Sequence, residues 1–294
     1  MRFIRFVYFG TVGLLIFTLA CTSPIETKLL KSQVGTQELY FDQHDKTNLT
    51  WSPDSTLLAY QTAVNTAIDS QYSTIFVYNL LENVVQDITA DDHHKRNCYP
   101  TFVTDSKSIL FTQNDQLYKM SLVNGERSPV TPSNDPPQFH PNVSPDGQLV
   151  VFDDGTDIYA VSIDGGPPQK LSESVTFPVK NPSWSPDGTK LACESPGQLA
   201  IFTFESTGIT LDRKFAGSFI DIEWAGRETP PFGCPILFRN SPGVAMIDPV
   251  RGDIFDAFFF NKNITSYCWA PNGRDIAFST PRFIYLAPML TTIE

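Results

Sequence analysis

The sequence predicts an all-β chain folded as a six-bladed β-propeller of four-stranded antiparallel blades. A unit of two short apolar runs joined by a tight turn recurs along the chain, anchored at Trp51, Phe102, Val143, Trp184, Trp224 and Trp269. The anchors are 51, 41, 41, 40 and 45 residues apart, and such a period is typical of four strands per propeller blade. No segment has a sustained helical period.

The clearest copy of this unit is residues 181–193, which read as strand, turn and strand. Its turn is Ser-Pro-Asp-Gly. Pro fixes φ at the first central position, Asp accepts local backbone hydrogen bonds, and Gly takes the position that needs φ > 0. We expect this turn to be structural, and Trp184 just before it to pack between neighbouring blades.

The other copies place the first two strands of each remaining blade. They are residues 48–60, a degenerate copy at 99–111, residues 140–152, a copy without the turn at 221–224 and 235–238, and residues 266–278. Third strands with alternating apolar residues are expected at 75–78, 117–120, 158–161, 199–202, 244–247 and 284–286. Fourth strands end at 87–89, 129–131 and 170–172 in three of the blades.

The last blade lacks a fourth strand, because the sequence ends soon after its third strand. Residues 27–41 contain two unassigned strand-like runs, 28–34 and 38–41. A strand from this region that completes the last blade would close the ring and remove open sheet edges. We therefore predict that an N-terminal strand forms the outer strand of the last blade.

Residues 1–20 have the pattern of an export signal. Arg2 and Arg5 precede an apolar run that is short for a bilayer span. Ala20-Cys21 resembles a bacterial lipobox, in which the cysteine is lipidated; a cleaved signal peptide or an uncleaved anchor is the alternative. Under the lipobox resemblance, Thr22 after the cysteine implies the outer membrane. The expected organisation is a signal peptide at 1–20, a lipidated tether at 21–26 and the propeller at 27–294.

Charge and cysteine content limit the classes of partner and site. The net charge is −11 and the isoelectric point is about 4.8, so a nucleic-acid partner is not expected, because such binding needs clustered Lys and Arg. The cell envelope, where an exported protein would reside, permits disulfides. The four remaining cysteines fall in four different repeats and form no CxxC pair: Cys98, Cys193, Cys234 and Cys268. Cys193 and Cys268 are expected to be small buried residues.

The repeat resembles that of the TolB-like, WD-repeat-like β-propeller family. The third copy carries Ser144-Pro-Asp-Gly147, then Asp157-Ile-Tyr-Ala-Val161, Asp164-Gly-Gly166 and Lys170-Leu-Ser172. The resemblance extends over about residues 45–287. It implies a propeller-only bacterial lipoprotein, since there is no room here for the α/β domain that precedes the propeller of TolB. The G-x-S-x-G elbow of the peptidases that share this repeat is also missing from the sequence.

One position, three residues before each anchor, is expected to line the mouth of the central channel. It is occupied by Asn48, Tyr99, His140, Asn181, Asp221 and Ser266, which we call the mouth residues. Polar groups around a concave mouth form a candidate ligand site. The alternative, that they only satisfy the backbone where each strand begins, stays open.

The four histidines, His44, His93, His94 and His140, all fall in loops that the repeat places on this same face. Neutral imidazoles that converge there form a candidate divalent-metal site, an arrangement that resembles that of propeller lyases acting on oligogalacturonate. Ordinary surface histidines are the alternative. Asp153, Asp154 and Asp157 are a candidate calcium site or a solvated acidic turn. Insertions at 63–73 and 226–234 are candidate partner contacts.

Two functions stay open on these observations. The first is a monomeric, envelope-anchored binding or scaffold protein that needs no cofactor, faces the periplasm and binds envelope proteins, peptides or oligosaccharides. The second is a metal-dependent polysaccharide lyase or hydrolase that uses the histidines. No nucleophile–base pair or phosphate-binding loop is recognisable, so no catalytic residue is assigned.

Overall fold

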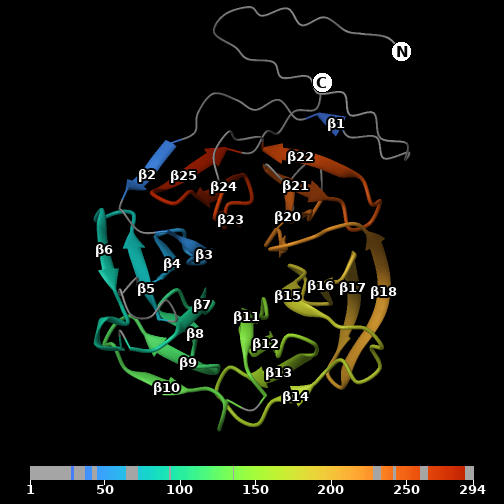
Figure 1. The fold of residues 1–294 in the computed structure, drawn as a ribbon, viewed down its shortest axis with the longest axis horizontal. Coiled ribbons are helices and arrows are strands. Elements are labelled where there is room, and N and C mark those ends of the chain that lie inside the picture. Colours follow the sequence, from blue (N-terminus) through green and yellow to red (C-terminus); the bar gives the residue numbers. More distant parts are fainter. Residues whose placement is uncertain are drawn as a thin grey trace, which may run out of the picture.

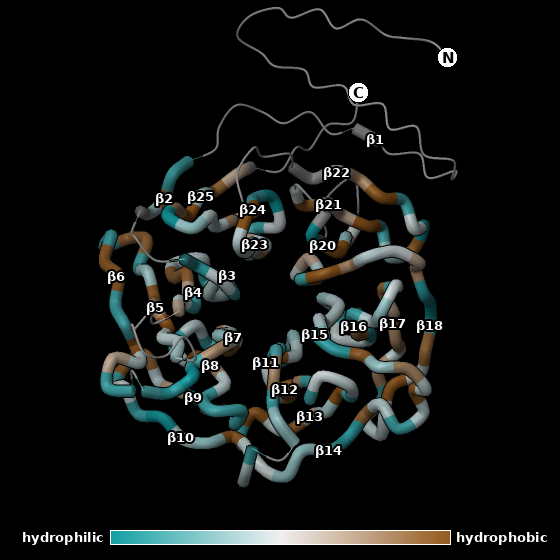
Figure 2. The backbone as a smooth tube through the Cα atoms, viewed as in Figure 1, coloured by the Kyte–Doolittle hydropathy of each residue, from teal (hydrophilic) through white to brown (hydrophobic). Residues whose placement is uncertain are grey.

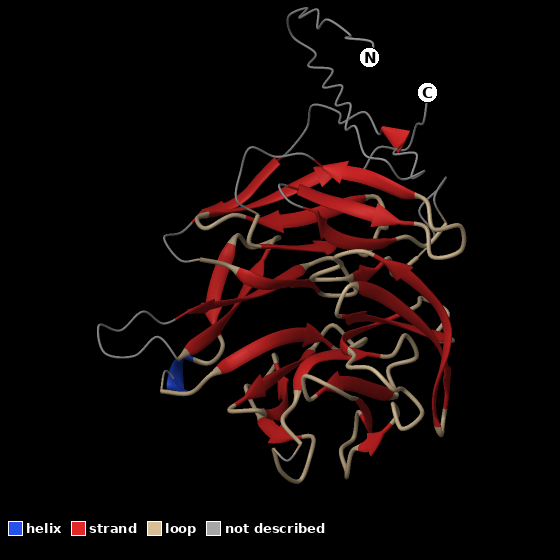
Figure 3. Cartoon of the chain, turned by 45° about the vertical axis from the view of Figure 1, so that its right-hand side comes forward, coloured by secondary structure: helices blue, strands red, loops and turns tan. Residues whose placement is uncertain are grey.

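The protein forms a closed ring of six blades around a central channel (Figure 1). The computed structural model describes residues 28–29, 37–41, 45–63, 72–92, 94–134, 136–227, 233–240, 243–258 and 264–288. The regular secondary structure within them is all strand apart from one short 3-10 helix, η1 (Ala90–Asp92), visible in Figure 3. The predicted fold class is confirmed.

The first two blades are four-stranded antiparallel sheets. Blade one consists of β3 (Thr47–Trp51), β4 (Leu57–Ala63), β5 (Ser73–Asn79) and β6 (Val84–Asp87). Blade two consists of β7 (Asn97–Phe102), β8 (Ser108–Gln113), β9 (Gln116–Ser121) and β10 (Arg127–Pro129).

The next two blades repeat this order from the channel outward. Blade three consists of β11 (Phe139–Val143), β12 (Leu149–Asp153), β13 (Ile158–Ser162) and β14 (Gln169–Lys170). Blade four consists of β15 (Lys180–Trp184), β16 (Lys190–Ser195), β17 (Gln198–Glu205) and the long outer strand β18 (Gly208–Ala216).

The last two blades both receive a strand from the N-terminal region. Blade five consists of β19 (Glu223–Trp224), β20 (Ile236–Asn240), β21 (Gly243–Ile247) and β22 (Ile254–Phe258), with β1 (Lys28–Leu29) added as a fifth strand parallel to β22. Blade six consists of β23 (Ser266–Trp269), β24 (Asp275–Ser279) and β25 (Phe283–Pro288), completed by β2 (Gln37–Phe41).

The predicted closure by an N-terminal strand is confirmed. Strand β2 pairs antiparallel with β25, from Gln37 opposite Leu286 to Phe41 opposite Phe283. The side chains of Leu39 and Tyr40 pack into the apolar cluster between blades six and one. The hydroxyl of Tyr78 donates to the carbonyl of Leu39 at 3.0 Å. The strand therefore joins the two ends of the ring by backbone pairing and by side-chain packing.

The Ser-Pro-Asp-Gly turns have the predicted geometry. Gly147 and Gly188 have φ of 74° and 71°, and this left-handed conformation suits glycine. In the turn of blade four, Asp187 Oδ1 accepts hydrogen bonds from the hydroxyl of Ser185 at 2.6 Å and from the amide of Thr189 at 3.0 Å. We call the end of the ring that carries these turns the turn face; the mouth residues lie at the opposite end of the first strands.

The hydrophobic core is divided among the six interfaces between blades. Each of six buried clusters combines side chains of two neighbouring blades, and Figure 2 shows hydrophobic residues in every blade rather than in one centre. Trp184 belongs to the cluster between blades three and four, which confirms its predicted packing. Its Nε1 atom, like those of Trp51 and Trp269, is buried without a partner in the described part of the chain.

Several predictions concern residues outside the described ranges, namely Cys21 with the signal and tether, His44, His93, and most of both insertions. Cys98, Cys193 and Cys268 are free thiols, and Cys193 and Cys268 are buried as predicted. Among the described residues, no helix has the length and apolar character needed to span a bilayer.

Candidate ligand site at the channel mouth

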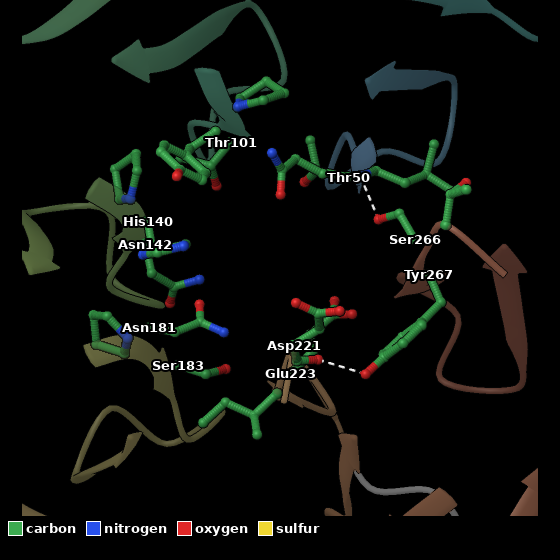
Figure 4. Close-up of a pocket in the computed structure, with 18 residues that line it drawn as sticks. Thr50, Thr101, His140, Asn142, Asn181, Ser183, Asp221, Glu223, Ser266 and Tyr267 are labelled. Carbon is green, nitrogen blue, oxygen red and sulfur yellow. Dashed lines mark hydrogen bonds between the residues drawn. The ribbon is translucent and has the colours of Figure 1, made fainter. Parts of the chain in front are cut away.

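A pocket opens at the centre of the ring and is lined by three consecutive residues from each blade. All six mouth residues line it. Figure 4 shows the labelled side chains around an open centre, with Asn181, Asp221 and Glu223 directed towards it. The cavity volume is about 180 Å³, below the range of about 300–1,000 Å³ that is usual for whole small-molecule ligands. The pocket thus suits one side chain or one ring of a larger partner.

Five of the six mouth residues have a left-handed backbone. Their φ angles are 50° for Asn48, 54° for Tyr99, 46° for His140, 49° for Asn181 and 54° for Asp221. The conformation is uncommon outside glycine, although Asn, Asp and His adopt it more readily than other residues. Sparsely populated backbone conformations at equivalent sites persist only where the surrounding structure holds them.

In blades one to four the cause is an irregularity in the first strand. In blades one to four, the pairing of the first and second strands shifts register across the mouth residue, for example between Lys180 and Ser183. Such a bulge redirects a side chain away from the regular pleat. In blades two to four the next residue is proline (Pro100, Pro141 and Pro182), which has no N–H, so the bulge leaves one fewer donor unpaired in the channel wall.

A second set of residues holds the mouth residues from the second strand of each blade. We call them the bridging residues, because they connect two blades. They are Gln61, Thr112, Asp153, Glu194, Arg239 and Ser279. In five blades the bridging residue follows the mouth residue by 13 positions. In blade five the larger loop places Arg239 further along the chain.

Asp153 is the fully buried carboxylate among these bridging residues, with no exposed surface. Its Oδ2 atom lies 2.8 Å from Nδ1 of His140 and accepts the backbone N–H of Asn181, in the next blade, at 2.9 Å. Its Oδ1 atom accepts the N–H of Gly155 at 2.9 Å. One carboxylate thus orients the histidine of blade three and fixes the backbone of blade four.

Two other blades use the same arrangement. Gln61 Oε1 accepts hydrogen bonds from Nδ2 of Asn48 at 2.7 Å and from the N–H of Tyr99, in the next blade, at 3.2 Å. Glu194 Oε1 accepts hydrogen bonds from Nδ2 of Asn181 at 2.6 Å and from the N–H of Ile222 at 3.4 Å. The ring of mouth residues is therefore held by hydrogen bonds that pass from blade to blade.

Blades two, five and six vary this pattern. Thr112 donates to the carbonyl of Gln138 at 2.8 Å, and Ser279 donates to the carbonyl of Lys46 at 3.0 Å. Arg239 Nε donates to Asp221 Oδ2 at 2.7 Å, and its Nη1 atom donates to the carbonyl of Ile264 at 2.7 Å.

Ser266 differs from the other mouth residues, because its backbone is not left-handed. Its hydroxyl accepts the N–H of Leu49 at 2.9 Å. It is 9% exposed. Although Ser266 lines the pocket, its side chain serves the junction of blades six and one, as the structural alternative expects.

A deeper layer of polar residues lies two positions after the mouth residues. Asn142, Ser183 and Glu223 each accept the backbone N–H of the anchor tryptophan in the next blade, at 3.2, 2.8 and 3.1 Å. Glu223 is the ionisable member. Burial raises its pKa to about 8, an effect that the N–H of Trp269 only partly opposes. A protonated carboxyl at neutral pH thus lines the channel.

Two aromatic rings stand together on one side of the mouth. The ring centroids of Tyr99 and His140 are 4.3 Å apart at an interplanar angle of 49°. Burial is the main reason that the pKa of Tyr99 rises to about 12. Tyr99 is thus a neutral donor at the rim, packed against the histidine that Asp153 orients.

The histidines do not all come to the pocket. Of the two in the described ranges, His140 lines it, whereas His94 packs edge-on against Tyr72 and is not among the lining residues. Among the described residues, no group of three His, Cys, Asp or Glu side chains is placed to hold a metal ion. His44 and His93 lie outside these ranges, so the four-histidine metal site stays a prediction.

The acidic turn of blade three is used by the protein itself. Asp154 Oδ1 accepts the N–H groups of Thr156 and Asp157 at 2.9 and 2.8 Å. Burial tends to raise the pKa of Asp154, but these hydrogen bonds outweigh it and lower the pKa. Asp157 accepts from Ser172 at 2.6 Å and pairs with Lys170 at 2.9 Å. Each aspartate has its own structural partners, and Asp153 is buried rather than solvated.

The sequence interpretation located the mouth residues but missed the bridging residues and Glu223. A constant separation of 13 positions was the available signal for the bridging set. Another was the enrichment of Asn, Asp and His at one repeat position, a composition that suits left-handed backbone. Glu223 carried no such signal, because the equivalent positions hold threonine, asparagine, serine and cysteine.

Comparison with solved structures agrees with this fold. A gluconolactonase of Xanthomonas campestris has a TM-score of 0.64 at 10% identity, over 90% of this chain and 91% of its own. A calcium-binding protein, regucalcin, of Agrobacterium tumefaciens has a TM-score of 0.60 at 12% identity, over 87% and 95%. An oligogalacturonate lyase in complex with manganese has a TM-score of 0.49 at 12% identity, over 86% and 90%.

The likenesses to the gluconolactonase and to regucalcin support the propeller fold and show no activity, since a fold of this kind carries many unrelated functions. Comparison of the sequence with protein-family models and with curated proteins gives no match. The function has to be argued from the site itself.

Proposed function

We propose that this chain is an envelope-anchored binding protein of the TolB-like propeller type, whose ligand site is the channel mouth. One observation carries the proposal. Five mouth residues have an uncommon backbone conformation and are hydrogen-bonded by residues of the second strands, within and between blades, and all of them line one polar pocket. Preorganised polar groups in a concave site lower the entropic cost of binding. A protein, peptide or oligosaccharide that inserts one group fits the small volume.

Site-specific photo-crosslinking tests this proposal. A photo-reactive residue in place of Thr101, which lines the pocket, should capture a partner in intact cells. The matched control is the same residue in place of Thr189, an exposed threonine on the turn face. Capture at both positions alike, or at neither, contradicts a ligand site at the mouth.

The anchor is the second part of the proposal. The apolar run before Cys21 and the small residue Ala20 support lipidation at that cysteine and attachment to the outer membrane, facing the periplasm. The variant Cys21→Ser should move the protein from the membrane fraction to the soluble fraction and abolish labelling by a fatty-acid analogue. Unchanged fractionation and labelling contradict the anchor.

A metal-dependent lyase or hydrolase is the alternative, and one observation favours it. Asp153 orients Nδ1 of His140, which leaves Nε2 at the mouth as a metal ligand or proton acceptor. Metal analysis of the purified protein separates the two functions. Stoichiometric metal that is lost in His140→Ala supports the enzyme, whereas metal-free protein that still captures its partner supports the binding protein.

A further inference from the structure

We propose that the group recognised at the channel mouth is a protonated amine. This inference rests on the proposed function and adds the chemical class of the ligand. The bridging residues form a hydrogen bond with one polar atom of several mouth side chains. The inference follows from the chemistry of the second polar atom, which remains available.

The two asparagines are both left with a carbonyl oxygen. Gln61 Oε1 accepts the backbone N–H of Tyr99, so the same atom accepts from Asn48, which must contribute its amino nitrogen Nδ2. A carboxylate only accepts hydrogen bonds, so Asn181 likewise contributes Nδ2 to Glu194. In each case Oδ1, an acceptor, is the atom that remains.

His140 and Asp221 follow the same logic. Asp153 accepts from Nδ1 of His140, and in the neutral imidazole the other nitrogen, Nε2, is then an acceptor. Arg239 donates to Oδ2 of Asp221, which leaves Oδ1. No other described residue bonds these remaining atoms. Four blades therefore present four acceptors around one pocket.

This set selects a ligand rich in donors. An ammonium group has three N–H donors and no acceptor, and its hydrogen bonds to ionised acceptors are among the stronger ones in proteins. Asp221 adds an acidic group on the side of blade five, and Arg239 is turned towards Asp221 and the carbonyl groups of blade six. A carboxylate or phosphate ligand finds no matching donor among the four atoms.

A metal ion is the competing occupant. Two of the four acceptors are amide oxygens, and no trio of His, Cys, Asp or Glu among the described residues is arranged for an ion. A cavity of about 180 Å³ accommodates the end of a lysine side chain or an amino terminus. The observations therefore favour the amine, and the metal becomes an outcome of the test.

Calorimetric titration of the full-length chain in detergent tests the inference with three peptides. Acetyl-Gly-Lys-Gly-amide offers a lysine ammonium, Gly-Gly-Gly-amide offers only an α-ammonium, and the Nε-acetyl form of the first peptide offers neither. We expect at least one of the first two to bind about tenfold more tightly than the third. The stronger of these two identifies the source of the amine.

The variants Asn181→Gly and Asp221→Gly should each weaken that binding about tenfold. Glycine adopts a positive φ without strain, so these changes remove an acceptor and keep the backbone. Ser55→Gly is the matched control, because Ser55 has φ of 65° and lies on the turn face; it should leave binding unchanged.

Equal binding of all three peptides, or none up to about 10 mM, overturns the amine. Stoichiometric binding of Mn²⁺ or Ca²⁺ that is lost in Asn181→Gly overturns it in favour of a metal. If the photo-crosslinked partner persists in these cases, the binding function stands and only the amine fails. If crosslinking at Thr101 also fails, the proposed function fails with it.

Discussion

Carboxylates accept backbone hydrogen bonds at both ends of the first strands, but the hydrogen bonds have different roles at the two ends. On the turn face, Asp187 accepts from Ser185 and Thr189, which are two residues away on either side. At the mouth, Asp153 accepts from Asn181, which is 28 residues away in another blade. Both ends contain residues with positive φ and carboxylates that accept backbone N–H groups.

The difference is in what remains after the hydrogen bonds are made. In the turn of blade four, the polar groups bond one another within residues 185–190. At the mouth, the hydrogen-bond partner comes from the second strand, which also bonds to the next blade, so one polar atom of four mouth side chains is left for a ligand. The conspicuous motif is thus structural, and the proposed site lies at the less conspicuous end.

The largest expected effect comes from removing a carboxylate at each end. Asp153→Ala leaves three donors without their acceptor, on His140, Asn181 and Gly155, and should lower the free energy of unfolding by about 2–4 kcal/mol. The control, Asp187→Ala, removes an exposed acceptor from a turn whose donors can bond water, and should cost about 1 kcal/mol. Urea denaturation measures both. Equal losses contradict the distinction between the two ends.

The pH dependence of stability should also separate the two ends. Burial raises the pKa of Glu223 from 4.5 to about 8, so between these values the folded state binds more protons than the unfolded state. Its contribution is therefore complete below about pH 4.5 and is lost as the pH rises through about 8. Glu223→Gln should reduce the fall in unfolding free energy between about pH 5 and pH 9 by about 1–3 kcal/mol.

On the turn face, the titration of Asp187 should affect the acidic part of the plot of unfolding free energy against pH. The hydroxyl of Ser185 and the N–H of Thr189 lower the pKa of Asp187. A lowered pKa gives a contribution that is present above the ordinary value of 3.8 and is lost as the pH falls through the folded pKa. Asp187→Asn therefore serves as the control: it should change the acid limb and leave the alkaline limb intact. A change in the alkaline limb with Asp187→Asn, and none with Glu223→Gln, contradicts the assignment.

The same contrast explains what the sequence could predict. Ser185-Pro-Asp-Gly188 is legible because all of its interactions fall within a few residues, and its recurrence gives the blade period. The mouth residues could be located by counting back from each anchor. Their orientation could not, because it depends on a bulge in the pairing of two strands and on acceptors from the second strand.

In blades five and six, counting positions back from the anchor or forward from the mouth residue does not find the equivalent side chain. In blade five the larger loop moves the bridging role to Arg239, 18 residues after Asp221, so no fixed spacing finds it. In blade six, Ser266 occupies the predicted position but bonds Leu49 instead. The sequence also indicated a strand near residue 28, yet its place as a parallel fifth strand of blade five depends on an edge that only the assembled ring provides.

A smaller effect should isolate backbone strain at the mouth. Asn181 has φ of 49°, which alanine disfavours by about 1–2 kcal/mol and glycine tolerates. Asn181→Ala and Asn181→Gly both lose the hydrogen bond to Glu194, so the difference between their unfolding free energies reports strain. We expect Asn181→Ala to be less stable by about 1 kcal/mol. Equal stabilities contradict a backbone held by the blades.

Gly188→Ala is the counterpart of this pair on the turn face. Gly188 has φ of 71°, and an added Cβ lies 3.7 Å from the nearest atom, Cδ of Pro145. There is thus room for the methyl group, and the cost of about 1 kcal/mol should come from the backbone alone. Peptide binding at the mouth should be unchanged in Gly188→Ala and weakened in both Asn181 variants.

The smallest effect tests whether the turn face has any connection between blades. Ser55 and Ser106 occupy equivalent turn positions with φ of 65° and 55°. Only the hydroxyl of Ser106 accepts a hydrogen bond from a neighbouring blade, from the N–H of Asp54 at 3.1 Å. Ser106→Gly should therefore lower the unfolding free energy by about 0.5–1 kcal/mol, whereas Ser55→Gly should stay within about 0.5 kcal/mol of the parent. Both are measured by urea denaturation, and a larger loss for Ser55→Gly would mean that the turns stabilise the ring through their local conformation alone.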